Sequence, residues 1–219
     1  MTTDVFYPDA DTESTSVDGY VSRSGVDQTF ANIVAGAGTA KGDADALASM
    51  PRVYASATTN QFQRIDRTIY LFDTSSIPSA NTVSSATLSI YGTNRTNGLG
   101  KSSWVAVTST PASNTALANA DYGNLGSTSL GSVAYDSWST SGYNDIALGD
   151  VSVVTKAGIT KLGGRLEWDR AGTFGGAWAS GAFTYQGGYL ADNAGTTNDP
   201  KLTVLHTAPA TARRVMVIA

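Results

Sequence analysis

The single imidazole of this chain is the first group that could do chemistry. His206 is the only histidine among 219 residues, and a hydrolase built on Ser, His and Asp would need it as its general base. It stands at the end of the segment PKLTVLHT (200–207), whose apolar side chains alternate as in a strand. A structural role in that strand is the simpler interpretation, so we expect no catalytic triad.

Paired carboxylates are the second candidate. Glu167 and Asp169 are two residues apart, and on a strand their side chains would share one face. Two carboxylates on either side of a sugar could cleave a glycosidic bond. Arg165 would lie on the same face, which makes a salt-bridged outer surface the simpler interpretation. The sequence therefore predicts a protein that is not an enzyme.

A third group of residues could hold a metal ion. Asp9, Asp11 and Glu13 alternate in the segment DADTE, and hard cations such as calcium prefer clusters of oxygen ligands. The segment lacks the glycine and the distal glutamate of an EF-hand loop, so a solvated acidic turn is the alternative. Structural calcium is the one cofactor that the sequence suggests.

Aromatic side chains could bind sugars, because a pyranose ring presents an apolar C–H face that stacks on an aromatic ring. Two segments rich in loop residues, near positions 140 and 180, would present Trp138, Tyr143, Trp178 and Tyr185 to a glycan. Packing of these rings in the core is the alternative.

The elements that must position these residues are short strands joined by tight loops. Charged residues make up only 15% of the chain, and 24 Ser and 28 Thr supply most of its polarity. Threonine favours half-buried strands, whereas serine and glycine favour turns. No segment shows sustained helical periodicity, although short helices are expected within 113–123 and 150–158.

Charge and hydropathy exclude several partners. A formal net charge of -4 leaves no basic face for a nucleic acid. The absence of cysteine excludes disulfides and thiolate metal sites, and no apolar run approaches membrane-spanning length. The N-terminal segment has neither the basic nor the apolar region of a signal peptide. We therefore expect a protein that binds neither nucleic acid nor membrane and stays in the cell that makes it.

One segment, RTIYLFD (67–73), indicates how the strands are layered. Ile69 and Leu71 would point to one side of a strand, and Tyr70 and Phe72 to the other. A strand that is apolar on both sides belongs in the middle of a sheet that is covered on both faces. A polar turn follows, and the next strand alternates apolar and polar residues.

About ten such strands, with turn signals between them and no internal repeat, predict an all-β fold. The architecture expected is a jelly-roll β-sandwich of two antiparallel sheets with one or two short helices in loops. No linker divides the chain, so residues 1–207 are predicted to form one domain and residues 208–219 a C-terminal tail.

The segment RTIYLFDTSSIPSANTVSSATLSIYG (67–92) resembles the signature of the DNRLRE family. The resemblance spans about residues 60–206 and is anchored at its two ends. Its matching residues are Arg67, Phe72, Asp73, Ser75, Ser76, Ile77, Pro78, Val83, Ala86, Thr87, Leu88 and Tyr91, and then Pro200, Lys201 and Leu202 in the closing strand. The family's usual Leu-Arg before Phe-Asp is Tyr70-Leu71 in this chain.

The resemblance implies a jelly-roll sandwich similar to carbohydrate-binding modules, as in bacterial surface proteins and in phage and environmental viral proteins. It implies no catalytic residue. The function expected first is that of a structural virion protein, either a phage capsid decoration or a part of a tail or fibre. The alternative is a carbohydrate-binding module that recognises surface glycans through exposed aromatic rings, located in the virion or outside the cell.

The C-terminal tail is the expected docking segment. An apolar, strand-forming run follows a flexible TAPATA hinge, and it could add a strand to a neighbouring subunit. Pairing with its own sheet is the alternative. The partners expected are capsid or tail subunits and further copies of the chain, and the docking residues are Arg213, Arg214, Val215, Met216, Val217 and Ile218.

Overall fold

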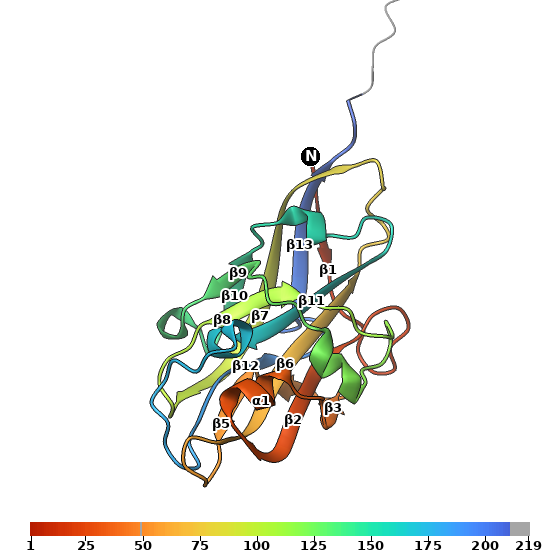
Figure 1. Ribbon diagram of the computed structural model, residues 1–219. Helices are drawn as coiled ribbons and strands as arrows, with labels where there is room; N and C mark the ends of the chain where they lie inside the picture. Colours follow the sequence, from red (N-terminus) through yellow and green to blue (C-terminus); the bar gives the residue numbers. More distant parts are fainter. Residues whose placement is uncertain (49, 211–219) are drawn as a thin grey trace, which may run out of the picture.

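Two long strands organise the fold. In a computed structural model that describes residues 1–48 and 50–210, β6 (Phe62–Asp73) and β7 (Thr82–Asn97) run through the centre of the molecule (Figure 1). The other strands are β1 (Thr2–Phe6), β2 (Asp18–Gln28), β3 (Ala40–Gly42), β4 (Leu47–Ala48), β5 (Arg52–Ala55), β8 (Trp104–Thr108), β9 (Gly131–Val133), β10 (Tyr143–Ala147), β11 (Ile159–Leu166), β12 (Phe183–Tyr189) and β13 (Lys201–Thr207).

The strands form two antiparallel layers, which confirms the predicted all-β sandwich. In the smaller layer, β7 pairs with β13 and β10, and β13 pairs with β1. In the larger layer, β6 pairs with β2 along one edge and with β5 and then β11 along the other. The last residues of β7 pair with β12, which also pairs with β5, so β7 belongs to both layers.

The first core fills the space between the two layers. Tyr70 and Phe72 of β6 face Leu88 and Ile90 of β7 across this core, and all four side chains are buried. Gly164 of β11 is needed here, because a Cβ at this position would lie 2.3 Å from the ring of Trp104. The sandwich therefore closes around large apolar and aromatic side chains.

The second core lies on the opposite face of the larger layer. Ile69 and Leu71 of β6 point into it, as predicted for a strand covered on both faces. Short helical segments cover this face: α1 (Phe30–Ala35), α2 (Glu167–Ala171) and the 3-10 turn η1 (Asn119–Asn124). Two further 3-10 turns, η2 (Tyr135–Ser137) and η3 (Val151–Val153), lie in other loops.

The predicted helices are shorter than expected. Within 150–158 there is only η3, where the Asp150 carboxylate accepts a hydrogen bond from the Ser152 amide at 2.9 Å. Within 113–123 the structure contains only the first part of η1. The tail residues predicted to dock, 213–218, lie outside the described residues.

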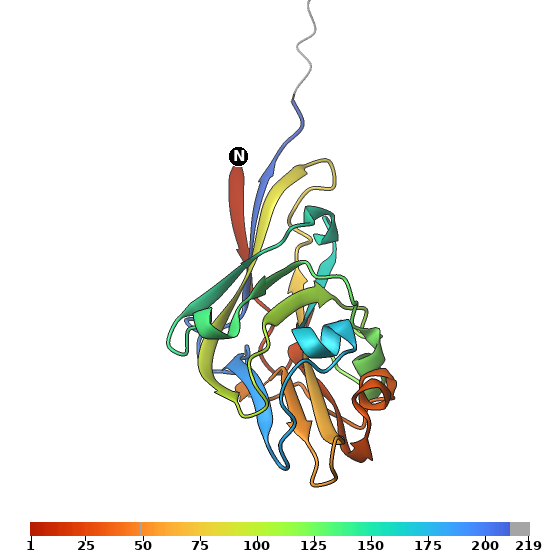
Figure 2. The same ribbon diagram turned by 60° about the vertical axis from the view of Figure 1, so that its left-hand side comes forward.

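The two ends of the molecule differ. Figures 1 and 2 show β1, β13 and the N-terminus together at one end, with β5 and β12 toward the other. β5, β12 and the first part of β6 carry the candidate site.

Candidate functional site

The candidate site begins with a row of three aromatic rings. Phe183 and Tyr185 alternate on β12, so their side chains leave the same face of the sheet. Tyr54 on β5 lies directly opposite Phe183. The Phe183 and Tyr185 rings stack with centroids 5.8 Å apart, and Tyr54 meets Phe183 edge to face at 5.3 Å. All three side chains are half-buried and belong to neither core.

A cluster of ions continues the same face across the next strands. Arg52 lies opposite Tyr185 on one side and opposite Asp66 of β6 on the other. The Nε atoms of Arg52 and Arg64 each donate to the Asp66 carboxylate at 2.7 Å, and the Ser22 hydroxyl donates to it as well. Asp66 is buried, whereas the two arginine side chains remain 18% and 30% exposed.

We call this set of six residues the platform: Tyr54, Phe183, Tyr185, Arg52, Arg64 and Asp66. Aromatic faces can pack against apolar C–H groups. The contacts to Asp66 use only the Nε atoms, and within residues 1–48 and 50–210 the terminal nitrogens of both guanidinium groups have no other partner, so they can bind a ligand's oxygen atoms. Asp66 already accepts from three donors, so it orients the arginines rather than acting as an acid or a base.

The structure separates the aromatic residues that were predicted to bind a glycan. Tyr185 belongs to the platform. Trp138 is buried in the first core, where its ring stacks on Trp104 at 6.0 Å, so the prediction that it faces a ligand is wrong. Trp178 is half-buried against the second core, and its Nε1 donates to the Gln61 carbonyl at 2.9 Å. Neither tryptophan reaches the platform's row of stacked rings.

Tyr143 is occupied by contacts within the protein. Its hydroxyl donates to the carbonyls of Thr197 and Asp199, at 2.9 and 3.0 Å. The Lys201 ammonium lies 3.8 Å from the ring centroid, and the Tyr91 ring packs edge to face against it. Burial raises the pKa of Tyr143 to about 12. Tyr143 therefore holds the loop before β13 in place and does not offer a free ring to a sugar.

The carboxylates of Glu167 and Asp169 do not form a pair. β11 ends at Leu166, and both residues lie in α2, so the prediction that they share one face of a strand is wrong. Glu167 pairs with Arg170 at 2.5 Å near the surface. Asp169 is buried and pairs with Arg165, so the predicted salt bridge is present but does not lie on an outer face.

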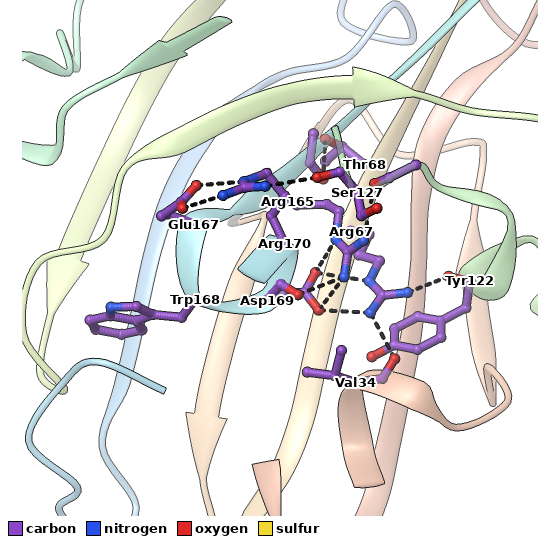
Figure 3. Close-up of polar contacts among 12 residues, drawn as sticks. Val34, Arg67, Thr68, Tyr122, Ser127, Arg165, Glu167, Trp168, Asp169 and Arg170 are labelled. Atoms are coloured by element: carbon purple, nitrogen blue, oxygen red, sulfur yellow. Dashed lines mark hydrogen bonds and ion pairs between the residues drawn. The ribbon is translucent and has the colours of Figure 1, made fainter. Parts of the chain in front are cut away.

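Asp169 is the centre of a buried cluster with two arginines (Figure 3). Arg67 donates to it through Nε and Nη2 at 2.8 and 2.7 Å, and Arg165 through Nε and Nη2 at 2.8 and 3.0 Å. Arg67 Nη2 also donates to the Val34 carbonyl, and Arg165 Nη1 donates to the Gly126 carbonyl. Burial by itself would raise the pKa of Asp169, but the two guanidinium groups outweigh burial and lower it.

This cluster ties the second core together. It joins β6, β11 and α2 to the end of α1, beside an open hollow of about 320 Å³. The sequence contains one signal that points to it: Arg67 opens a run of apolar residues that occupies the middle of a sheet. A buried arginine needs a carboxylate partner, but the sequence does not say which one.

His206 is bonded at both ring nitrogens. Asn81 Nδ2 lies 2.8 Å from Nδ1, and because an amide nitrogen can only donate, Nδ1 accepts and Nε2 carries the proton. Nε2 then donates to the Asp4 carboxylate at 2.9 Å. His206 is buried, and these contacts hold β1 on β13.

The three acids predicted to hold calcium do not act together. Asp9 accepts hydrogen bonds from the amides of residues 14–16. Burial opposes them, but these bonds outweigh it and lower the pKa of Asp9 to about 2. Asp11 and Glu13 lie near Asp192 instead. Asp9 therefore closes its own loop through Oδ2, and calcium binding by Asp9, Asp11 and Glu13 stays a prediction.

Comparison with protein-family models finds no match, and comparison with curated protein sequences finds none either. Among the residues that the structure describes, none of the helices has the length and apolar character that a membrane crossing requires. The assignment of function therefore depends on the site itself.

Proposed function

We propose that this protein is a non-enzymatic β-sandwich module that binds a glycan on the platform. The observation that carries the proposal is the row of Tyr54, Phe183 and Tyr185, whose rings contact one another but neither core. Aromatic rings that remain half-exposed on a sheet face are suited to stacking on the C–H face of a sugar. The resemblance of the chain to DNRLRE modules agrees with this proposal.

The charges beside the rings favour an acidic sugar. Arg52 and Arg64 against Asp66 give this part of the platform two positive charges and one negative charge, a net charge of +1. Guanidinium groups recognise carboxylates through paired hydrogen bonds. We therefore propose a glycan that carries uronic acid or a similar anionic unit.

The test is a glycan array followed by calorimetry on the full chain. Phe183→Ala and Tyr185→Ala should each weaken binding about two- to tenfold, since a stacked aromatic contact contributes about 0.5–1.5 kcal/mol. Tyr91→Ala, which removes a half-buried tyrosine outside the platform, is the matched control and should leave binding unchanged. Loss of binding in the control, or no glycan bound at all, would count against the proposal.

A second proposal is that the module is a structural virion protein that docks on capsid or tail subunits or on its own copies. The observation that favours it is the edge strand β1, which among the described residues pairs only with β13. Val5 in β1 is 45% exposed, and Tyr7, directly after the strand, is 37% exposed. A free strand edge with apolar side chains is suited to the addition of a neighbour's strand.

Sedimentation separates the two proposals. Val5→Asp should abolish self-association or capsid co-sedimentation and leave glycan binding intact. Tyr185→Ala should weaken glycan binding and leave self-association and capsid co-sedimentation intact. Deletion of residues 208–219 tests the docking role predicted for the tail. A chain that stays monomeric and binds no virion particle at high concentration would remove the second proposal.

A further inference from the structure

Three arginines line the open hollow of about 320 Å³ that lies beside the buried Asp169 cluster. Arg67 comes from β6, Arg165 from β11 and Arg170 from α2 (Figure 3). Asp169 is the one acid among the residues that line the hollow in the described part of the chain. The lining side chains therefore carry three positive charges and one negative charge, a net charge of +2.

The two buried arginines each keep one N–H group that no other residue of the described chain accepts. A guanidinium group has five N–H donors. Arg67 makes four hydrogen bonds, two to Asp169 and two to backbone carbonyls. Arg165 also makes four, three to Asp169 and one to the Gly126 carbonyl. In both side chains the remaining donor is on Nη1.

Arg170 keeps two donors. Its Nε and Nη2 bond to the Glu167 carboxylate, and its Nη1 bonds to the Ser127 carbonyl, which leaves one N–H on each terminal nitrogen within residues 1–48 and 50–210. The Arg170 side chain is 24% exposed, whereas those of Arg67 and Arg165 are 3% and 6% exposed. The hollow thus has an accessible arginine at its rim and two buried ones behind it.

The guanidinium groups are held in place before any ligand arrives. Asp169 fixes both buried arginines through its two oxygens. The Arg67 Cζ atom also lies 3.8 Å from the centroid of the Tyr122 ring. Because these side chains are already ordered, a ligand that bonds to them loses little affinity to their ordering.

The rest of the lining leaves room for a ligand. It includes the apolar side chains of Val34 and Leu125 and the glycines Gly123 and Gly172. A Cβ at either of these two glycines would meet no atom within 4 Å. The hollow can therefore hold a small anionic group together with the carbon atoms that carry it.

We propose that this hollow binds a tetrahedral oxyanion, the phosphate or sulfate group of a small ligand. Arginine is well suited to phosphate because its planar donors match the oxygen atoms. A carboxylate takes two parallel bonds from one guanidinium, but Arg67 and Arg165 have one free donor each. An anion with several oxygens can accept one bond from each arginine. A phosphate monoester carries about -1.5 to -2 at neutral pH, which matches the charge of the lining.

The hollow is separate from the platform. Asp66 and Arg67 are neighbours on β6, so their side chains leave opposite faces of the sheet. Asp66 belongs to the platform and Arg67 to the hollow. The proposal therefore does not depend on glycan binding by the platform, and each site can be tested with the other intact.

The experiment is calorimetric titration of the full chain at neutral pH and constant ionic strength, with sodium phosphate, sodium sulfate and glucose 6-phosphate in separate runs. At least one of the three should show saturable binding to one site. Tighter binding of glucose 6-phosphate would identify a monoester as the ligand, and equal binding of phosphate would identify the free ion.

Variants at the rim assign the binding to the hollow. Arg170→Gln should weaken it about tenfold, since hydrogen bonds to charged groups are among the stronger ones. Glu167→Gln should strengthen it, by up to about fivefold, because it frees Arg170 from its exposed ion pair. Lys101→Gln is the matched control: it removes a cation from the exposed pair with Asp136, does not line the hollow and should change nothing. Tyr185→Ala should also leave the binding unchanged.

Three results would overturn the site. One is the absence of binding heat for all three anions at concentrations up to tens of millimolar. Another is an equal loss of binding in Arg170→Gln and Lys101→Gln, which would indicate a general effect of charge. The third is a rise in melting temperature with phosphate that Arg170→Gln shares in full, because salts excluded from the protein surface stabilise any fold.

Discussion

Asp169 and Asp18 are both buried aspartates, but their surroundings are opposite. Asp169 lies between the guanidinium groups of Arg67 and Arg165, which lower its pKa against the effect of burial. Asp18 accepts from the Ala191 amide and has further acids around it, and burial raises its pKa. One carboxylate stabilises the fold as a charged group, whereas burial favours the neutral, protonated form of the other.

Removal of Asp169 should be strongly destabilising. Asp169→Ala leaves two buried guanidinium groups without their carboxylate, and breaking a buried pair in this way costs about 3–5 kcal/mol. Glu167→Ala removes an exposed pair with Arg170 and should cost at most about 1 kcal/mol. Urea unfolding measures both. Equal losses in the two variants would contradict the structural role of the cluster.

The contribution of Asp199 to the pH dependence of stability should have an unusual sign. The pKa of Asp199 rises from its usual 3.8 to about 6 in the folded chain, so in this window the folded state binds more protons than the unfolded state. The free energy of unfolding contributed by Asp199 therefore falls as pH rises from 3.8 to 6. Asp169, with its lowered pKa, acts in the opposite direction and loses its contribution only at more acidic pH.

Urea denaturation across pH 4 to 7 checks this sign. Asp199→Asn should flatten the fall in stability. An unchanged slope in Asp199→Asn would show that another group is responsible.

At the scale of single elements, periodicity predicted the buried strands well. The alternation of Ile69 and Leu71 with Tyr70 and Phe72 was enough to place β6 between two cores, because side-chain direction in a strand follows directly from spacing. The same reasoning failed at Glu167 and Asp169, where the chain turns from β11 into α2. α2 has only five residues, which are too few to show a helical period in the sequence.

The platform could not be predicted from the sequence. Its residues come from β5, β6 and β12, and only the register of these strands places Tyr54 beside Phe183 and Arg52 beside Asp66. Tyr185 was among the predicted aromatic residues, but so was Trp138. Loop residues next to an aromatic residue in the sequence do not show whether its ring points into the core or into solvent.

His206 should determine how firmly β1 is held. His206→Ala removes the bonds to Asp4 and Asn81 and leaves the buried Asn81 amide without its partner, at a cost of about 1–3 kcal/mol. Amide hydrogen exchange in residues 2–6 should become faster, while exchange in β6 stays slow. Unchanged protection of β1 would mean that its backbone pairing with β13 is sufficient.

At the scale of the molecule, the two cores share one sheet. β6 contributes Ile69 to one core and Tyr70 to the other, so neither core can open without disturbing the same strand. Leu88→Ala in the first core and Ile69→Ala in the second should each cost about 2–5 kcal/mol. Both variants should shift a single thermal transition whose calorimetric and van't Hoff enthalpies agree. Two resolved transitions would show that the cores unfold independently.

The placement of the chain ends has a practical consequence for recognition. The N-terminus and the end of β13 emerge at the pole opposite to β5 and β12 (Figure 2). A tether at the N-terminus would therefore keep β5 and β12, the strands that carry Tyr54, Phe183 and Tyr185, at the end of the molecule far from the anchoring surface. Immobilising the chain by an N-terminal tag should leave these strands accessible to ligands in solution.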